Sequence, residues 1–261
     1  MKDITELINK IILGDCLEVM RERIPDESID LIYLDPPFGD NNVDKQFNIE
    51  WKNLQHYLSW IKKRLEECYR VLKSTGSIYL HCDWRTTHHL RFLMDEIFGQ
   101  QNFKNTIAWS YESVNTPTKY YPRRHHDIHF YTKTDNYTFN TLIEPPRELP
   151  SKSKLRQGSF KYVTDFWFIK SVAQGFMTKK EDYIDNTRYL YPTQKPIALL
   201  KRIIRASSNE GDIVLDPFIG SGTTALAALK LNRRFIGIEI NKEVVELAKR
   251  RISFDLKQTR L

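Results

Sequence analysis

Cysteine is scarce in this sequence, and long apolar runs and signal-like segments are absent. The three cysteines, Cys16, Cys68 and Cys82, are too few and too scattered for a disulfide framework, which favours a reducing compartment. No apolar run approaches the roughly 20 residues that a membrane helix needs. The N-terminal segment MKDITELINKIILGD lacks the apolar core and cleavage site of a signal peptide. We therefore expect a cytoplasmic protein with no membrane partner.

Other absences exclude several function classes. No Gly-Lys pair occurs in the chain, so the phosphate-binding P-loop is excluded. There is no internal repeat and no low-complexity tract, which argues against repeat architectures. The run His81-Cys82-Asp83, with His88 and His89, does not have the spacing of a structural zinc site, and the deaminase signature is missing. We expect no metal site.

The composition is that of a globular protein with an excess of positive charge. Its 261 residues suffice for one large α/β domain with an insertion or for two small domains. A hydrophobic content of 41% supports a substantial core, and the net charge of +7 favours a polyanionic partner.

The hydrophobic pattern predicts alternating strands and helices at both ends of the chain. Short apolar runs that stop at polar or glycine residues are typical of buried parallel strands, whereas apolar residues at helical spacing indicate helices. The expected strands span residues 10–13, 28–34, 77–82, 106–111, 127–132, 212–215 and 234–240. The expected helices span residues 17–23, 51–72, 86–98, 197–206, 223–231 and 242–252.

This alternation fades between residues 111 and 190, where prolines, basic residues and aromatic residues accumulate. Basic side chains neutralise phosphates, and aromatic side chains can stack on bases. We therefore divide the chain into a first half of an α/β domain (1–110), a recognition insertion (111–190) and a second half (191–261). The basic candidates for DNA contact are Lys119, Arg123, Arg124, Lys152, Lys154 and Arg156.

The C-terminal half carries a glycine-rich turn between a strand and a helix. Asp216-Pro217-Phe218 follows the strand, and Gly220-Ser221-Gly222 precedes the helix that begins at Thr223. Glycines allow a tight turn and close approach of a ligand. Glu239 ends the next strand about 20 residues later, where a carboxylate can accept bonds from ribose hydroxyls. A nicotinamide cofactor and a tight turn without a ligand are alternatives, although Asp-Pro-Phe is not part of the dinucleotide fingerprint.

The two ends of the chain are expected to complete one sheet. The C-terminal strands need neighbours, and the runs Ile11–Leu13 and Leu31–Leu34 can supply them. Asp15, Asp35, Asp216 and Glu239 then all follow or end strands, and ligands bind beyond the carboxyl ends of such strands. We predict that these four acids converge on one crevice.

In the N-terminal half, a hydrophobic strand ends at Asp35, which is followed by Pro36, Pro37 and Phe38. Consecutive prolines stiffen the backbone, so the Asp35 carboxylate and the Pro36 carbonyl would be two fixed acceptors. An amino group on a planar ring fits them, with the ring stacked on Phe38. Acceptors on both N–H groups would favour a pyramidal nitrogen and free its lone pair for attack. A rigid strand-end turn with an N-cap aspartate is the alternative.

The motifs Asp35–Phe38, Thr193–Pro196 and Asp216–Thr224, in this order, closely resemble the β-class amino-methyltransferases of bacterial restriction–modification systems. The resemblance covers nearly the whole chain except about residues 111–191. It implies a circularly permuted, Rossmann-like class I methyltransferase fold with a doubly wound, mostly parallel sheet. It also implies S-adenosylmethionine as the cofactor and a DNA base as the acceptor.

Roles carried over from the resemblance concern both halves of the chain. Asp35, Pro36, Pro37 and Phe38 resemble the catalytic motif. The remaining roles concern S-adenosylmethionine. The residues that resemble the loop around its methionine part are Asp216, Phe218, Gly220, Ser221, Gly222 and Thr223. Glu239 resembles the ribose ligand, Asp15 resembles the residue that reads adenine, and Thr193 and Lys195 resemble the motif that closes over the methionine carboxylate.

The resemblance also bears on the substrate. In this family Asp-Pro-Pro usually accompanies adenine and Ser-Pro-Pro cytosine N4, so Asp35 favours N6 methylation of a flipped adenine in double-stranded DNA. No cysteine follows a proline, which argues against cytosine C5 methylation. Cytosine-N4 methylation and a non-catalytic DNA-binding subunit stay open as alternatives, and a nicotinamide-dependent dehydrogenase is a more distant one. The resemblance further suggests a homodimer and a cognate restriction endonuclease as partners.

Overall fold

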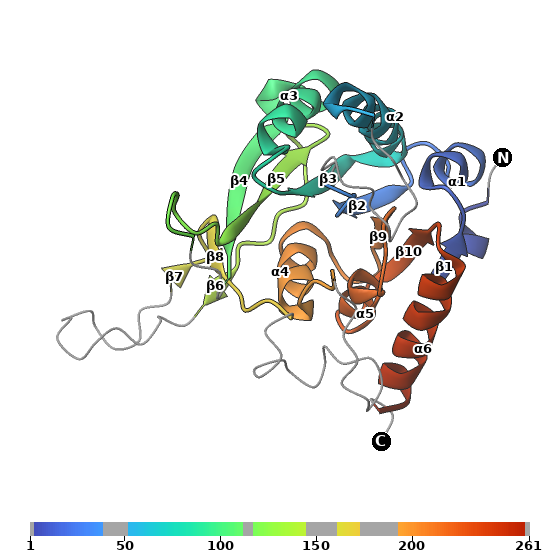
Figure 1. The fold of residues 1–261 in the computed structure, drawn as a ribbon. Helices are drawn as coiled ribbons and strands as arrows, with labels where there is room; N and C mark the ends of the chain where they lie inside the picture. The colour runs from blue at the N-terminus through green and yellow to red at the C-terminus, as the bar shows by residue number, and fades with distance from the viewer. Residues whose placement is uncertain (1–2, 39–51, 112–116, 145–160, 173–192, 259–261) are drawn as a thin grey trace.

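A computed structural model describes residues 3–38, 52–111, 117–144, 161–172 and 193–258. Its centre is an eight-stranded sheet in the order β1-β10-β9-β2-β3-β5-β4-β8 (Figure 1). The first five strands in this order are parallel, β5 runs antiparallel to β3 and β4, and β8 runs parallel to β4. The strands are β1 (Lys10–Leu13), β2 (Ile29–Leu34), β3 (Leu72–Cys82), β4 (Phe103–Ser110), β5 (His125–Thr132), β8 (Phe166–Phe168), β9 (Ile213–Asp216) and β10 (Arg234–Glu239).

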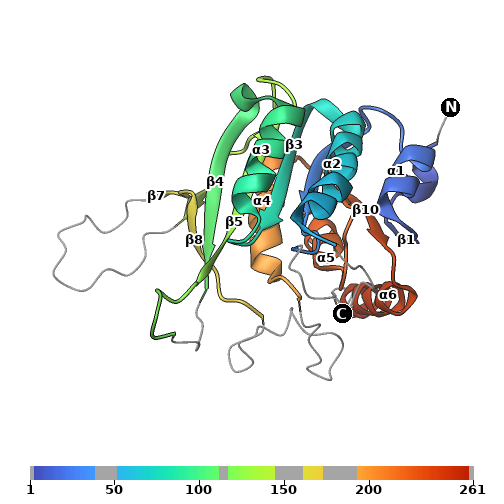
Figure 2. The ribbon, with the colours of Figure 1, turned by 45° about the horizontal axis from the view of Figure 1, so that its top comes forward.

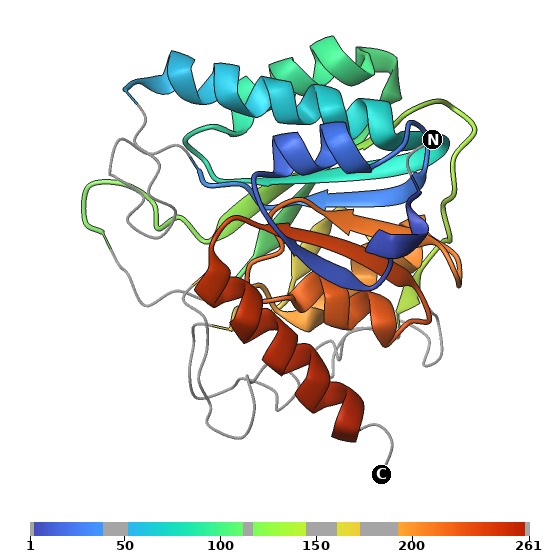
Figure 3. The ribbon, with the colours of Figure 1, turned by 90° about the vertical axis from the view of Figure 1, so that its right-hand side faces the viewer.

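Helices cover both faces of this sheet, as Figures 2 and 3 show. The first three helices pack on one face, where Ile32, Leu80 and Leu215 point. The last three pack on the other face, where Leu31 and Tyr79 point. Alternate residues of each strand thus enter two separate cores, which explains why the strands read as continuous apolar runs. The helices are α1 (Cys16–Arg23), α2 (Leu54–Val71), α3 (Thr87–Phe98), α4 (Ile197–Ser207), α5 (Thr223–Leu229) and α6 (Lys242–Gln258), with short 3-10 turns η1 (Thr5–Leu7) and η2 (Gln100–Asn102).

The two ends of the chain complete one sheet, as the sequence predicts. β1 pairs with β10 along Lys10–Leu13, and β2 pairs with β9 at Leu31 and Ile32. The C-terminal strands β9 and β10 therefore lie between two N-terminal strands. The permuted, doubly wound arrangement is confirmed, and the described helices include none that could cross a membrane.

The structure differs from the sequence expectation in the segment 111–190. β5 and β8 come from this segment but belong to the main sheet, so the segment is not a separate insertion throughout. Trp167 of β8 is buried, and its ring packs into the core on the face of the sheet that the last three helices cover. A small hairpin of β6 (Ile143–Glu144) and β7 (Lys161–Tyr162) lies beside this edge (Figure 1).

Several element bounds also shift. β3 begins at Leu72 instead of residue 77, because its first residues pair with the start of β2. α6 continues to Gln258, beyond the expected end at residue 252, since no glycine or proline interrupts it.

Gly237 marks a place where β10 must lack a side chain. A Cβ atom there would lie 2.9 Å from Cγ1 of Ile219, which belongs to the glycine-rich turn. Ile219 is itself buried and donates its backbone N–H to the carbonyl of Ile238. Gly237 therefore lets the turn lie directly on the sheet.

We expect Gly237→Ala to destabilise the protein by about 1–3 kcal/mol, the usual cost of overpacking a core. Chemical denaturation would measure this loss. Because the clash is with Ile219, the cost of Gly237→Ala should shrink when Ile219→Ala is present in the same chain. An unchanged cost in the double variant would contradict the packing argument.

Candidate functional site

Four acidic residues gather at the carboxyl edge of the parallel strands. Asp15 follows β1, Glu239 ends β10, Asp216 ends β9 and Asp35 follows β2. These strands are neighbours in the sheet, so the predicted convergence of the four acids follows from the observed strand order. Two adjoining pockets open at this edge.

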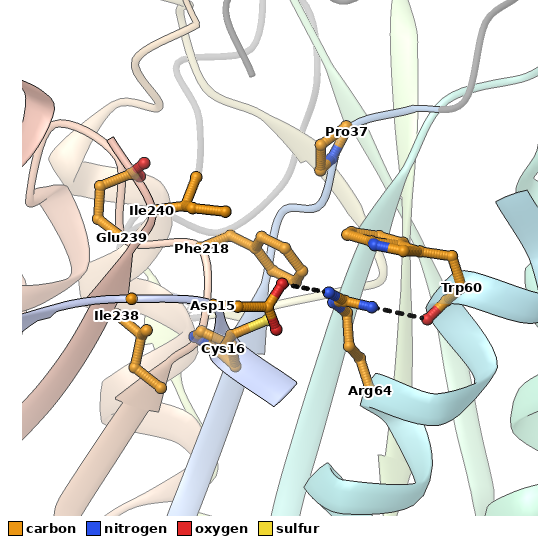
Figure 4. A pocket seen from close by; sticks show the side chains of 11 residues that line it. Asp15, Cys16, Pro37, Trp60, Arg64, Phe218, Ile238, Glu239 and Ile240 are labelled. Carbon is orange, nitrogen blue, oxygen red and sulfur yellow. Dashed lines mark hydrogen bonds and ion pairs between the residues drawn. The ribbon is translucent and has the colours of Figure 1, made fainter. Parts of the chain in front are cut away.

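The first pocket lies between β1, β10 and α2 (Figure 4). Its apolar walls are Trp60, Phe218 and Pro37, and Trp60 and Phe218 have ring centroids 5.8 Å apart. Its charged groups are Asp15, Glu239 and Arg64. An apolar wall next to two carboxylates suits a nucleoside, because a base can pack on the wall while the acids accept bonds from N–H and hydroxyl groups.

Arg64 of α2 fixes Asp15 in this pocket. Its Nη2 donates to Asp15 Oδ2 at 2.5 Å, and its guanidinium lies 3.8 Å from the centre of the Trp60 ring. Asp15 Oδ1 also caps α1 by accepting from the backbone of Leu17 at 2.7 Å. Sequence reasoning missed Trp60 and Arg64. Their spacing of four residues, which places both on one helix face, was the available signal, whereas the burial of the Arg64 cation is visible only in the structure.

The glycine-rich turn is held by the acids on either side of it. Asp216 accepts bonds from the backbone of Phe218 at 3.0 Å and from the Thr224 hydroxyl at 2.5 Å. Glu239 accepts from the backbone of Gly220 at 3.2 Å, while its other oxygen accepts from Asn241. Gly222 has φ of +81°, a left-handed conformation that favours glycine.

Arg251 of α6 supports the same turn from below and was not identified from the sequence. It is 1% exposed, and its Nη1 donates to the Ser221 carbonyl at 3.1 Å and to the Thr223 hydroxyl at 2.8 Å. No motif signals this residue, because α6 reads as an ordinary amphipathic helix.

The second pocket contains Asp35 and adjoins the turn; Tyr33, Thr193, Lys195 and Asp216 help to line it. Lys195 Nζ forms an ion pair with Asp35 Oδ2. The other oxygen, Oδ1, is buried and has no hydrogen-bond partner within the described residues. Asp35 and Lys195 are thus in contact, although 160 positions separate them in the sequence.

Phe38 lies beside Asp35 as the end of the catalytic-type motif. Its ring is 5.7 Å from Lys195 Nζ and contacts the rings of His81 and His126. Pro36 and Pro37 are buried, and Thr193 is exposed at the start of the segment that carries Lys195. Lys195 was expected over the cofactor carboxylate, and the structure places its ammonium on Asp35.

Comparison with known proteins identifies the family. The family model described as DNA methylase, of the N6/N4 type, matches residues 29–250. The chain belongs to this family. A DNA adenine methyltransferase, YhdJ of Escherichia coli strain K12, is 39% identical over 93% of this chain and 82% of its own length. The type II methyltransferase M.HpaI of Haemophilus parainfluenzae is 36% identical over 93% of this chain and 74% of its own.

Solved structures agree on the fold of this DNA methylase. The cytosine-N4-specific PvuII DNA methyltransferase matches with a TM-score of 0.70 and 20% identity, covering 92% of this chain and 85% of the other. The complex of M1.HpyAVI with S-adenosylmethionine matches with a TM-score of 0.59 and 25% identity, covering 93% and 98%. The expected class I methyltransferase fold is thereby confirmed.

The basic residues predicted to contact DNA are only partly described. Arg123 lies 3.6 Å from the centre of the Trp84 ring and 4.5 Å from that of Tyr120. Trp84 is 48% exposed and follows β3 at the edge that carries the pockets, a position that sequence reasoning did not single out. Lys119 and Arg124 are exposed. Lys152, Lys154 and Arg156 lie outside the described residues, so the DNA contacts stay predictions.

The histidines form no metal site in the part of the chain that the structure describes, where no group of three or more metal-type ligands occurs. His81 is buried and His126 is half-buried, and both lie against Phe38. Burial and the Lys195 charge lower the pKa of His81 well below its ordinary value and that of His126 to about 3. Both rings are therefore neutral at physiological pH.

Burial also raises the pKa values of the acids at the strand ends. It raises the pKa of Asp216 to about 7, against the opposing bonds from Thr224 and Phe218. It raises the pKa of Asp35 as well, although the Lys195 ammonium opposes this rise. The pKa of Glu239 is raised by burial and held down in part by three backbone N–H groups.

The pKa of Asp216 predicts a pH dependence of stability. With a pKa of about 7, Asp216 should keep its proton to a higher pH in the folded protein than in the unfolded chain, where its pKa is near 3.8. The free energy of unfolding should therefore fall as pH rises through this window, and Asp216→Asn should abolish that part of the fall, a few kcal/mol at most. Denaturant titrations of both proteins at pH 5 and pH 8 test it. Equal pH dependence in the two proteins would refute the assignment.

Arg251→Met should loosen the glycine-rich turn, because the Ser221 carbonyl loses its buried donor. We expect the DNA methylase to bind S-adenosylmethionine at least roughly tenfold more weakly, because the turn loses the buried hydrogen bonds to Ser221 and Thr223. Arg251→Lys should recover part of the loss. Isothermal calorimetry measures the affinity and circular dichroism checks the fold. Unchanged affinity in a folded Arg251→Met protein would show that the turn does not depend on this side chain.

Proposed function

We propose that this DNA methylase transfers a methyl group from S-adenosylmethionine to the N6 amino group of adenine in a short target sequence of double-stranded DNA. The observation that carries the proposal is the free oxygen of Asp35. Asp35 Oδ1 is buried, lies 3.9 Å from His81 Nδ1 and lacks a hydrogen-bond donor within the described residues. Such an acceptor is costly unless a ligand supplies an N–H group, and the amino group of a flipped base does so.

The residues of the first pocket fit the nucleoside part of S-adenosylmethionine. The apolar wall of Trp60 and Phe218 would pack against its adenine, and the carboxylate oxygens of Asp15 and Glu239 can each accept a further bond from N–H and hydroxyl groups. The turn at residues 220–223 adjoins Asp35 in the second pocket and suits the methionine part. When bound, S-adenosylmethionine supplies a methyl group on a positively charged sulfur, which an amine can attack directly.

Asp35 and the Pro36 carbonyl orient the amino group in this proposal. Each accepts one N–H, so the lone pair of the nitrogen is directed at the methyl carbon. A carbon–nitrogen bond forms while the carbon–sulfur bond breaks with its electrons staying on sulfur. The nitrogen then carries one proton too many, and Asp35 Oδ1 is placed to accept it. The raised pKa of this carboxyl makes it a better proton acceptor than an exposed aspartate.

Two observations support adenine over cytosine N4. The motif begins with Asp35, and the relative YhdJ carries the name DNA adenine methyltransferase. The likeness to the cytosine-N4-specific PvuII enzyme concerns the fold alone at 20% identity. Cytosine C5 chemistry needs a thiolate, whereas all three cysteines are buried and burial raises the pKa of Cys16 to about 12.

The partners follow from the same proposal. The exposed Arg123 and Trp84 at the pocket edge favour a DNA duplex, because cations pair with phosphates and exposed rings stack on bases. A homodimer, a cognate restriction endonuclease and a cytoplasmic location stay predictions from the sequence.

The test is methyl transfer from labelled S-adenosylmethionine to unmethylated bacterial genomic DNA, followed by nucleoside analysis. We expect label in N6-methyladenine. Asp35→Ala should lower the rate at least about a hundredfold while it leaves cofactor affinity within a few-fold. Asp135→Ala, an exposed carboxylate that follows β5, is the matched control.

Each other outcome has a distinct meaning. Label in N4-methylcytosine would leave the proposed mechanism unchanged and make cytosine the target base instead of adenine. Cofactor binding without transfer to any DNA would favour a non-catalytic subunit, and turnover by Asp35→Ala would remove Asp35 from the mechanism.

A further inference from the structure

A chain of three hydrogen-bonded side chains runs from Tyr33, which lines the pocket of Asp35, through the buried His81 to the half-buried His126. The Tyr33 hydroxyl lies 2.9 Å from Nδ1 of His81, and Nε2 of His81 lies 2.9 Å from Nδ1 of His126. Neither histidine belongs to a known motif, and the proposed methyl transfer uses neither of them.

The protons along this chain can be assigned from hydrogen-bonding rules. Tyr33 is 2% exposed, and a buried hydroxyl must donate to an acceptor. Within the described residues its hydrogen-bond partner is His81 Nδ1. Burial raises the pKa of Tyr33, so the phenol keeps its proton and donates it. His81 Nδ1 therefore carries no hydrogen, and the proton of this neutral ring lies on Nε2.

The same reasoning fixes His126. Its Nδ1 accepts from His81 Nε2, so its own proton lies on Nε2. The two nitrogens of an imidazole point in divergent directions, and Nε2 thus faces away from His81. Within the described part of the chain, no hydrogen bond to His126 Nε2 occurs. Tyr33 and His81 thereby hold His126 as an N–H donor.

The ring that carries this donor lies beside Phe38, on which the target base would stack in the proposed mechanism. The His126 ring is 5.4 Å from the Phe38 ring at an interplanar angle of 83°. Tyr111 borders it on another side with a centroid separation of 5.3 Å. Because the His126 ring is nearly perpendicular to Phe38, its N–H bond can lie in the plane of a base stacked on Phe38.

Resting on the proposed function, we propose that His126 Nε2–H donates to the ring nitrogen of the flipped adenine that adjoins its amino group. Adenine offers such an acceptor on either side of this group, at N1 and at N7. Asp35 and Pro36 would accept from the amino group while His126 donates to its neighbour. His126 is then a base-orienting residue that bonds the ring of the target, and Tyr33 and His81 are positioning residues that set its tautomer.

The substrate for the test is a duplex with a target site first mapped by the N6-methyladenine that the wild-type protein leaves in genomic DNA. His126→Phe keeps the ring and removes the donor. We expect kcat/KM for DNA to fall ~10- to 100-fold, as for a base acceptor left unpaired in the site, with unchanged affinity for S-adenosylmethionine. His126→Gln, which retains an N–H donor, should recover part of the loss.

Matched variants separate the donor from general disturbance. His125→Phe changes the preceding, exposed residue of β5 and should leave kcat/KM unaltered. Tyr33→Phe removes the proton that sets the tautomer of His81 and should give a smaller loss of the same kind. His126→Phe and Tyr33→Phe together should cost no more than His126→Phe alone.

Base analogues provide the decisive readout. The kcat/KM of the wild-type protein should fall by a comparable factor when the target adenine is replaced by 7-deazaadenine or 1-deazaadenine. The loss is expected for whichever analogue lacks the nitrogen that His126 binds. His126→Phe should show no further loss on that analogue. Equal penalties in both proteins on both analogues would refute the bond to His126. Absence of N6-methyladenine with the wild-type protein would instead refute the proposed function itself.

Discussion

The insertion of β9 between β10 and β2 is the constraint on which the site depends. Parallel pairing joins the last third of the chain to its first third, and it aligns the carboxyl ends of strands far apart in sequence. Ligands bind at this edge in open α/β sheets because the loops that follow the strands lie there together. The Asp-Pro-Pro segment and the glycine-rich turn become neighbours only through these strand pairs.

This arrangement concentrates negative charge, and the protein offsets it with cations from distant segments. Asp15 is paired with Arg64 of α2, and Asp35 is paired with Lys195, which precedes α4. Asp216 and Glu239 rely instead on N–H and hydroxyl donors of the turn itself. Asp216 and Glu239 thus link the turn to the ends of β9 and β10. These bonds restrain the backbone that would bind the ligand.

Much of the fold could be predicted from the sequence, because buried parallel strands are continuous apolar runs and each ends at a polar residue. The pairing of Ile11–Leu13 with β10 followed from the need of β10 for a neighbour. The strand at 127–132 was expected, but its place in the main sheet was not, because it lies among prolines and basic residues that suggested a separate insertion. β8 was missed altogether, because it is only three residues long and buries Trp167 alone. Likewise, Arg64, Arg251 and His126 act through contacts across the fold, and no local spacing reveals such partners.

The hydrogen bonds of the four acids distinguish structural from chemical roles. Both oxygens of Asp15, Asp216 and Glu239 have protein donors, so none of these three carboxylates has an oxygen without a partner, although each oxygen can still accept a second bond from a ligand. Asp35 has a donor on one oxygen, and the other is buried without a partner within the described residues. Such an acceptor costs about 1–3 kcal/mol, which selection would remove by substitution if it served stability alone. In the proposed mechanism this cost is recovered when a base amino group enters, which supports Asp35 as the residue that holds the acceptor amine.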